Sequence, residues 1–110
     1  MGTNEWSKSE KEIARQAFEL AYIRECKSIE EELRRMVSEL HDPKGLWSIH
    51  TYLTEKLQET DREYDYRYSV LPFVFARFLH KGWITIGDLK GLSEDKIEAI
   101  KRISTLPIEE

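Results

Sequence analysis

The sequence has 110 residues, which is enough for one modest hydrophobic core but not for two independent ones. Charged residues make up 35% of it and hydrophobic residues 40%, a proportion typical of long helices with solvated faces or of an oligomer. The net charge of -4 argues against nucleic acid or an anionic membrane as a general partner, and the single cysteine excludes an intrachain disulfide or a zinc site built from several thiolates.

The first predicted helix begins at Ser9, because Ser9 and Glu12 have the spacing of a capping box, and it runs to about Leu40. Along it, apolar residues alternate four and three positions apart, at Tyr22, Cys26, Ile29, Leu33, Met36 and Leu40. This spacing is typical of a coiled-coil seam. Because one chain of this size cannot bury so long a helix along its whole length, we predict a homodimer interface there. A monomer with a bent helix covered by the tail is the alternative.

A loop over residues 41–45 ends this helix, since Pro43 disfavours helical geometry at Asp42 and Gly45 tolerates a positive φ. The reversal predicts a helical hairpin. A second helix, from about Leu46 to Arg62, should bury one stripe against the first helix. The stripe contains Leu46, Ile49, Leu53 and Leu57.

A neighbouring face of the second predicted helix carries Trp47 among polar residues, with His50 at its border. The other members are Thr51, Thr54, Gln58 and Asp61. A tryptophan surrounded by polar side chains is common in protein interfaces, so this face is a candidate partner-binding patch. A tryptophan that fills a groove in its own dimer is an equal alternative.

The run from Asp61 to Tyr68 mixes acids, bases and tyrosines, and it predicts a hydrogen-bonded corner between helices. A third helix should follow over 70–80, capped by Ser69 and ended by Gly82. Two short helical segments, over 85–90 and 93–103, complete a small head, and the second is opened by Ser93-Glu94-Asp95. Phe73, Phe75, Phe78 and Trp83 are predicted core residues, with one of them exposed at a tip.

None of these elements carries a recognisable catalytic apparatus. The histidines lack metal-ligand spacing, and Cys26 is interpreted as a small buried hydrophobic residue. Residues 86–97 are weakly similar to a helix-hairpin-helix DNA-binding module, but the chain has one copy and is acidic. No apolar run has the length of a bilayer, and the N-terminus lacks a signal-peptide core. We therefore predict a non-enzymatic, cytoplasmic protein-binding protein without membrane insertion.

The predicted fold is all-α, with a long N-terminal helix in a helical hairpin, a small C-terminal helical head, and two copies in the assembly. It forms a single domain over residues 1–110, with a dimerisation part at about 9–66 and a head at about 67–104.

Residues scattered over nearly the whole chain make it resemble the fluorescence recovery protein family. They are Trp6-Ser7, Ala17-Phe18, Ala21-Tyr22, Arg24-Glu25, Leu46-Trp47, His50, Leu53, Lys56, Asp61, Tyr64-Asp65, Arg67, Ser69-Val70, Phe73-Val74-Phe75-Ala76, Gly82 and Asp95-Lys96. The resemblance implies a cyanobacterial, all-helical homodimer with no cofactor of its own. It also implies binding to the C-terminal domain of the orange carotenoid protein, at the cytoplasmic face of thylakoids, which speeds the return of the red form to the orange form.

By that resemblance, the functional patch near the dimer interface contains Trp47 and His50, and Phe73 lies on the head at the opposite end. The candidate partner-binding residues are Trp47, His50, Thr51, Thr54, Leu57 and Phe73, and the candidate dimer residues are Tyr22, Cys26, Ile29, Leu33, Met36 and Trp47. The chain has Thr51 and Leu57 where the family is expected to carry Asp and Arg, and Ala99 in place of a basic residue. The alternative function is therefore a dimeric helical scaffold for a different protein partner.

Overall fold

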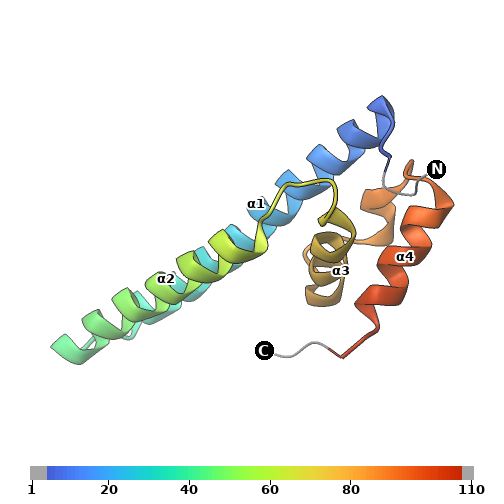
Figure 1. Ribbon diagram of the computed structural model, residues 1–110. Coiled ribbons are helices and arrows are strands. Elements are labelled where there is room, and N and C mark those ends of the chain that lie inside the picture. Colours follow the sequence, from blue (N-terminus) through green and yellow to red (C-terminus); the bar gives the residue numbers. More distant parts are fainter. Residues whose placement is uncertain (1–4, 108–110) are drawn as a thin grey trace.

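The computed structural model describes residues 5–107, which form four α-helices and one short 3-10 helix, with no strand among them. The elements are α1 (Lys8–Ser38), α2 (Pro43–Glu63), α3 (Leu71–Lys81), η1 (Ile86–Leu89) and α4 (Glu94–Ser104). Figure 1 shows that α1 and α2 form an antiparallel hairpin, while α3, η1 and α4 gather beside the first half of α1 as a head. The all-helical prediction is confirmed. The molecule is elongated, measuring 59 × 25 × 20 Å.

Helix α1 begins earlier than the sequence predicted, because its N-cap is Ser7 and not Ser9. The Glu10 amide donates to Ser7 Oγ at 3.1 Å, and the Ser7 amide donates to Glu10 Oε1 at 3.0 Å, which completes a capping box. Both serines have a glutamate three residues later, so local spacing did not choose between them. Glu10 is also held by residues of α4, and this tertiary contact favours the earlier start.

Helix α1 ends at Ser38 and α2 begins at Pro43, so the loop between them is residues 39–42 and not the predicted 41–45. The Asp42 side chain accepts a hydrogen bond from the Gly45 amide at 3.1 Å, and Pro43 occupies the first turn, where its missing amide costs nothing. Pro43 thus starts a helix instead of breaking one. Gly45 lies inside that helix and has no positive φ, contrary to the sequence-based expectation.

The predicted buried stripe of α2 was wrong for three of its four leucine and isoleucine positions. Leu46, Leu53 and Leu57 are 52%, 37% and 61% exposed. The half-buried or buried residues of α2 are instead Gly45, Ile49, Tyr52, Lys56, Glu59, Thr60 and Glu63. Long polar side chains can cover a neighbouring helix with their apolar stems, so a purely hydrophobic count picks the wrong stripe. Lys56 is one of these residues, and its ammonium lies 5.8 Å from the centre of the Tyr52 ring one turn earlier on the same helix.

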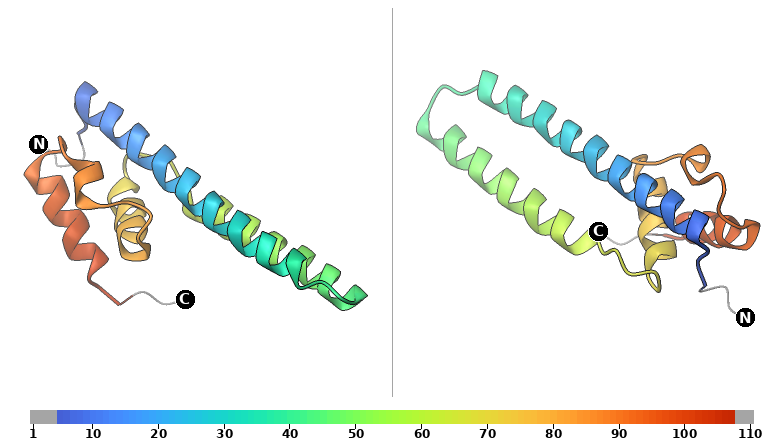
Figure 2. Two further views of the ribbon diagram at one scale, coloured as in Figure 1. Left: turned by 180° about the vertical axis from the view of Figure 1, so that it is seen from behind. Right: turned by 90° about the horizontal axis from the view of Figure 1, so that it is seen from above.

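The hydrophobic core lies in the head, where α3, η1 and α4 close against α1. Its largest fully buried side chains are Phe75, Phe78, Leu71, Ile84, Leu89 and Ile100. Helix α1 contributes Ala14, Ala17 and Ala21, each 0% exposed, and such small residues let the head approach the helix closely. Figure 2 shows that α1 continues from this contact into the hairpin.

Helix α3 begins at Leu71 after Val70, and no side chain caps it, so the predicted cap at Ser69 and start at Val70 were wrong. Gly82 ends the helix with a φ of 86°, as predicted, because this left-handed conformation costs glycine little. Ser93 caps α4, and its Oγ accepts from the Lys96 amide at 3.3 Å, also as predicted. Phe75 and Phe78 are buried, while Phe73 is the exposed phenylalanine.

Candidate protein-binding surfaces

The Trp47 patch, defined by Trp47, His50, Thr51 and Thr54, lies on the solvent side of α2. Trp47 is 65% exposed, the highest value among the large hydrophobic residues described, and the other three residues are exposed as well. The rings of Trp47 and His50 meet edge to face with centroids 6.5 Å apart. Residues 45–54 carry no formal charge in a chain that is 35% charged. The patch can therefore accept a partner without desolvating an ion.

A second surface, the apolar hairpin face, lies beside this patch and spans both helices of the hairpin. A helix turns roughly 100° per residue, so Leu46, Leu53 and Leu57 share one side of α2. On the other arm of the hairpin, the matching side carries Tyr22 and Val37 of α1, and Leu40 lies in the loop that follows α1. In the order Tyr22, Val37, Leu40, Leu46, Leu53, Leu57, the exposed fractions are 48%, 50%, 37%, 52%, 37% and 61%. Exposed apolar side chains gathered on one side of a hairpin make this face a candidate interaction site.

The sequence-predicted dimer residues fall into two groups. Tyr22 and Trp47 are exposed, whereas Cys26, Ile29, Leu33 and Met36 are half-buried in the single chain. Cys26 was predicted to be buried, and it is only half-buried because it borders the open apolar hairpin face. A side-chain hydrogen bond with the Cys26 thiol raises the pKa of Tyr22 above its ordinary value. Trp47 lies on the adjoining side of α2, roughly 100° around the helix from Leu46.

The head packs against the other side of α1. Arg24 and Cys26 are two residues apart and so point to nearly opposite sides of the helix. Arg24 donates to the Trp83 carbonyl at 2.9 Å and to Asp88 Oδ2 at 2.8 Å, which fixes η1 against α1. The hydrogen bond from Arg24 is the main cause that lowers the pKa of Asp88. The head thus covers the side of α1 that carries Ala14, Ala17 and Ala21 and leaves the apolar hairpin face open.

The corner between α2 and α3 is hydrogen-bonded, as the sequence predicted. Tyr64 Oη donates to Glu25 Oε1 at 2.8 Å, and its ring lies 4.7 Å from Phe78 and 5.4 Å from Phe18, centroid to centroid. Burial is the main cause that raises the pKa of Tyr64, and burial also raises the pKa of Tyr66 to about 12. Asp65 accepts from Arg67 Nε at 2.8 Å, which is a local turn contact. The corner therefore joins hairpin and head rigidly.

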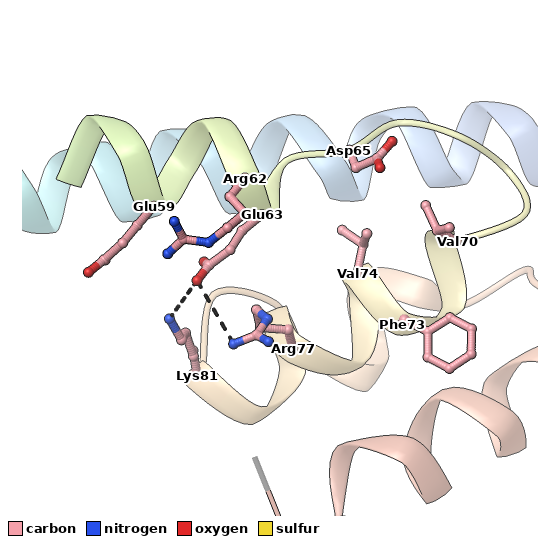
Figure 3. Close-up of a pocket in the computed structure, with 9 residues that line it drawn as sticks. All are labelled: Glu59, Arg62, Glu63, Asp65, Val70, Phe73, Val74, Arg77 and Lys81. Carbon is pink, nitrogen blue, oxygen red and sulfur yellow. Dashed lines mark hydrogen bonds and ion pairs between the residues drawn. The ribbon is translucent and has the colours of Figure 1, made fainter. Parts of the chain in front are cut away.

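Phe73 lies on the head, far from the Trp47 patch, so the structure does not bring all candidate partner-binding residues together. It is 61% exposed and borders a groove of about 610 Å³ between the last turns of α2 and helix α3 (Figure 3). The groove is lined by Glu59, Arg62, Glu63, Asp65, Val70, Phe73, Val74, Arg77 and Lys81. Trp47 lies near the far end of the hairpin, where α2 begins (Figure 1). The two surfaces are thus separate contact regions.

Sequence reasoning missed a buried ion pair that ties the two ends of the chain together. Lys96 Nζ lies 3.2 Å from Glu10 Oε1, and the residues are 7% and 8% exposed. Glu10 Oε2 also accepts from the Ser93 amide at 2.8 Å, and Lys96 donates to the Glu5 carbonyl at 2.7 Å. The hydrogen bond from the Ser7 amide is the main cause that lowers the pKa of Glu10. No local pattern signals a contact between residues so distant in sequence.

Within residues 5–107, no helix is long and apolar enough to cross a membrane. Over the same residues, no group of three His, Cys, Asp or Glu side chains is placed to hold a metal ion.

Comparison with known proteins gives consistent matches over almost the whole chain. Residues 6–104 match the family described as photoprotection regulator fluorescence recovery protein. The fluorescence recovery protein of a Synechocystis strain is 35% identical over 101 residues, which cover 92% of this chain and 93% of that protein. The structure of the Fremyella diplosiphon fluorescence recovery protein matches with a TM-score of 0.88 and 38% identity, covering 93% of this chain and 100% of that one. The Synechocystis structure matches with a TM-score of 0.88 and 34% identity, with the same coverage.

Proposed function

This chain belongs to the fluorescence recovery protein family of photoprotection regulators, and on that premise we propose that it regulates the orange carotenoid protein without catalysing a reaction. It binds the C-terminal domain of the photoactivated red form and accelerates the return to the resting orange form, which restores antenna fluorescence. The observation that carries the proposal is the exposed, uncharged Trp47 patch on a chain that matches the family over residues 6–104.

The proposed assembly is a homodimer in which two apolar hairpin faces cover each other. Each face exposes six large apolar side chains on one side of a two-helix layer, and a soluble monomer gains free energy by burying such a surface. The pairing is isologous, because the same face meets itself across a two-fold axis. Tyr22, Cys26 and Leu33 border the contact from α1, and Leu46 and Leu53 border it from α2.

The partner-binding surface consists of Trp47, His50, Thr51 and Thr54 on the hairpin, with Leu57 at the edge that it shares with the dimer contact and Phe73 as a second contact on the head. Aromatic side chains at the centre of an exposed patch are common binding hot spots, which supports Trp47 as the main anchor. The His50 ring packs beside the Trp47 indole, with the two ring centroids 6.5 Å apart. The ring orientation of Trp47 is thereby restricted before the partner arrives, which lowers the entropic cost of binding.

Acceleration of the partner's relaxation requires differential affinity. A protein that bound the red form, the orange form and the state between them equally tightly would change no rate. The regulator therefore binds an arrangement of the carotenoid protein that lies between the two forms more tightly than it binds the red form. Its action takes place in the cytoplasm, at thylakoids where the partner is found.

The departures at Thr51, Leu57 and Ala99 favour a second candidate, a dimeric helical scaffold with a different protein partner. Thr51 and Leu57 are both exposed, and Leu57 is 61% exposed, so a partner could reach a side chain at either position. Because the two residues are threonine and leucine, neither supplies a charged contact. Charge-assisted hydrogen bonds are among the stronger contacts at interfaces, so their absence reduces affinity for a partner that needs them.

The test is to photoactivate orange carotenoid protein and follow its dark recovery with and without this chain. We expect faster recovery, and we expect Trp47→Leu to remove most of the acceleration while Tyr52→Phe, on the half-buried side of α2, retains it. An unchanged recovery rate together with no complex on size-exclusion chromatography would overturn the proposal in favour of the scaffold.

A further inference from the structure

One side of α2 carries a row of four exposed residues that lies away from the apolar hairpin face. At roughly 100° per residue, the four fall within about 60° of one another around the helix. They are Lys44, Ser48, Thr51 and Glu55. Leu53, in the apolar hairpin face, points to nearly the opposite side of the helix from Lys44. A dimer formed through the apolar hairpin faces therefore leaves this row accessible.

The row borders a hollow of about 510 Å³ that also includes the Trp47 side chain. Lys44 lines the hollow at the start of α2, and Glu55 lines it roughly three turns later. Trp47, Ser48 and Thr51 lie between them. The hollow thus continues the Trp47 patch on the side away from the proposed dimer contact. A partner that binds Trp47 from this side also meets both charged residues.

Lys44 and Glu55 are the first charged residues on either side of the uncharged stretch 45–54. At about 1.5 Å per residue, they are separated by about 16 Å along the helix. Opposite charges at the two ends of one uncharged surface give that surface a direction, with its positive end at the start of α2. Thr51 and the other residues between them add no formal charge.

Both charges are available to a partner. None of the ion pairs between side chains of residues 5–107 includes Lys44 or Glu55. Lys56 follows Glu55 in the sequence, but it pairs with Glu59 at 3.4 Å. An ion pair with a partner at either end of the row therefore breaks no ion pair within this part of the chain.

Lys44 also lies where its charge does not favour the helix. It belongs to the first turn of α2, and the free amides of a first turn form the positive end of the helix dipole. A cation at this end destabilises a helix slightly, whereas an acidic residue stabilises it. Helix stability therefore does not account for a lysine at this position, whereas contact with a partner carboxylate does.

We infer that Lys44 and Glu55 determine the specificity of the Trp47 patch by fixing the direction in which a segment of the partner protein docks along α2. The segment carries a carboxylate that pairs with Lys44 and a cation that pairs with Glu55, and an apolar side chain between them packs on Trp47. Charges at the rim of an interface set its register and the rate of encounter, while the central anchor supplies most of the affinity. The inference rests on the proposed function, because it adds the orientation of the partner bound there.

The test exchanges the two charges in the double variant Lys44→Glu/Glu55→Lys, which keeps the net charge of the wild type. Because only the order of the charges along α2 changes, the long-range attraction between the two proteins stays nearly the same. The exchange places an acid in the first turn of α2, so it should not weaken the helix. Far-UV circular dichroism checks that the variant is folded.

The measurement is the rate of association with photoactivated orange carotenoid protein, followed by surface plasmon resonance under continuous illumination. At low ionic strength, we expect the exchange variant to associate roughly tenfold more slowly than the wild type. The difference should shrink at high ionic strength, because salt screens exposed charges. The control exchanges an exposed ion pair of α4, in Glu98→Lys/Lys101→Glu, and should associate at the wild-type rate.

The outcomes separate this inference from the proposed function. If the exchange variant associates at the wild-type rate while Trp47→Leu binds more weakly, the inference is wrong and the regulator role stands. If the α4 control slows association by the same factor, the inference is also wrong, because the effect does not depend on where the charges lie. If the wild type forms no complex with the orange carotenoid protein, the proposed function fails and this inference fails with it.

Discussion

The head and the hairpin differ in how far they bury their apolar side chains. In the head, Phe75 and Phe78 are 0% and 1% exposed, and α3 and α4 pack against each other and against α1. In the hairpin, Trp47 and Leu57 are 65% and 61% exposed, and Thr60 is the one buried residue of α2. The head thus completes its core within one chain, whereas the hairpin leaves an apolar face exposed.

Helix α1 belongs to both regions and changes character along its length. Its first half presents Ala14, Ala17 and Ala21 to the head, all fully buried. Its second half has a solvated side with exposed ion pairs, such as Arg34–Glu30 at 2.7 Å and Arg35–Glu39 at 2.8 Å. Exposed pairs of this kind contribute little free energy, so the second half of α1 depends on its apolar side for stability.

The largest effect is expected from opening the head core. Phe78→Ala should lower the free energy of unfolding by about 3–5 kcal/mol, because it removes a buried ring and leaves a cavity. Urea denaturation followed by circular dichroism measures this change. Phe73→Ala, on the exposed side of the same helix, should change stability by less than about 0.5 kcal/mol. Similar losses for both variants would contradict the assignment of the core.

The next largest effect is expected from placing a charge on the apolar hairpin face. Leu53→Glu should weaken association by roughly a hundredfold, or about 2.8 kcal/mol, because the carboxylate is desolvated in the dimer. At low protein concentration the hairpin should then lose helicity in the far-UV spectrum while the near-UV signal of Trp6 and Trp83 persists.

Ser48→Glu is the control for this variant, because Ser48 is exposed and lies outside the apolar hairpin face. It should behave as the wild type does. If Leu53→Glu loses the far-UV helical signal and the near-UV tryptophan signal together, the hairpin and the head unfold as one unit.

A smaller effect is expected from the buried ion pair that closes the head onto the start of α1. Lys96→Met should destabilise the chain by about 2 kcal/mol, because Glu10 loses a charged hydrogen-bond donor while it stays buried. Thermal unfolding measures the loss. Lys101→Met, one turn further along α4 and exposed, should have almost no effect.

The same carboxylate predicts a pH dependence. The pKa of Glu10 is lowered from its ordinary value of 4.5, so the folded state favours the ionised form. Its contribution to stability is complete above pH 4.5 and is lost as the pH falls through the lowered pKa. In Glu10→Gln, stability measured by urea denaturation between neutral and acidic pH should therefore fall less steeply than in the wild type. If stability falls with pH as steeply in Glu10→Gln as in the wild type, the ionisation of Glu10 does not contribute to this pH dependence.

The smallest effect is expected at the end of α3. Gly82 has a φ of 86°, and a Cβ built there meets no atom within 4 Å, so the cost of Gly82→Ala is backbone strain alone. We expect about 1 kcal/mol of destabilisation by chemical denaturation. Gly82→Asn should cost less, since asparagine tolerates this conformation better than alanine does. A Gly82→Ala variant as stable as the wild type would contradict the left-handed conformation at Gly82.

Sequence patterns predicted the helices well where local chemistry sets their ends. Gly82 and Ser93 act through their own backbone or side chain, so both caps were found from sequence. Ser7 was missed, because its choice over Ser9 depends on contacts of Glu10 with α4. The ion pair between Glu10 and Lys96 joins residues that no local pattern connects.

The candidate site shows the same limit. The exposed Trp47 was predicted, since a tryptophan among threonines does not fit a core stripe. The exposure of Leu46, Leu53 and Leu57 was not predicted, because hydrophobic spacing cannot tell a face that meets α1 from one that awaits another molecule. Glu63 on α2 forms ion pairs with Arg77 and Lys81 on α3. Sequence patterns did not predict these pairs, because they join two different helices.

In the proposed dimer, a second copy of the chain covers the apolar hairpin face. Light scattering on the purified protein at micromolar concentration tests it most directly. The account predicts a molar mass of twice the 13.1 kDa of one chain, falling toward that value in Leu53→Glu. A wild-type mass of 13.1 kDa, with the hairpin still fully helical, would contradict it.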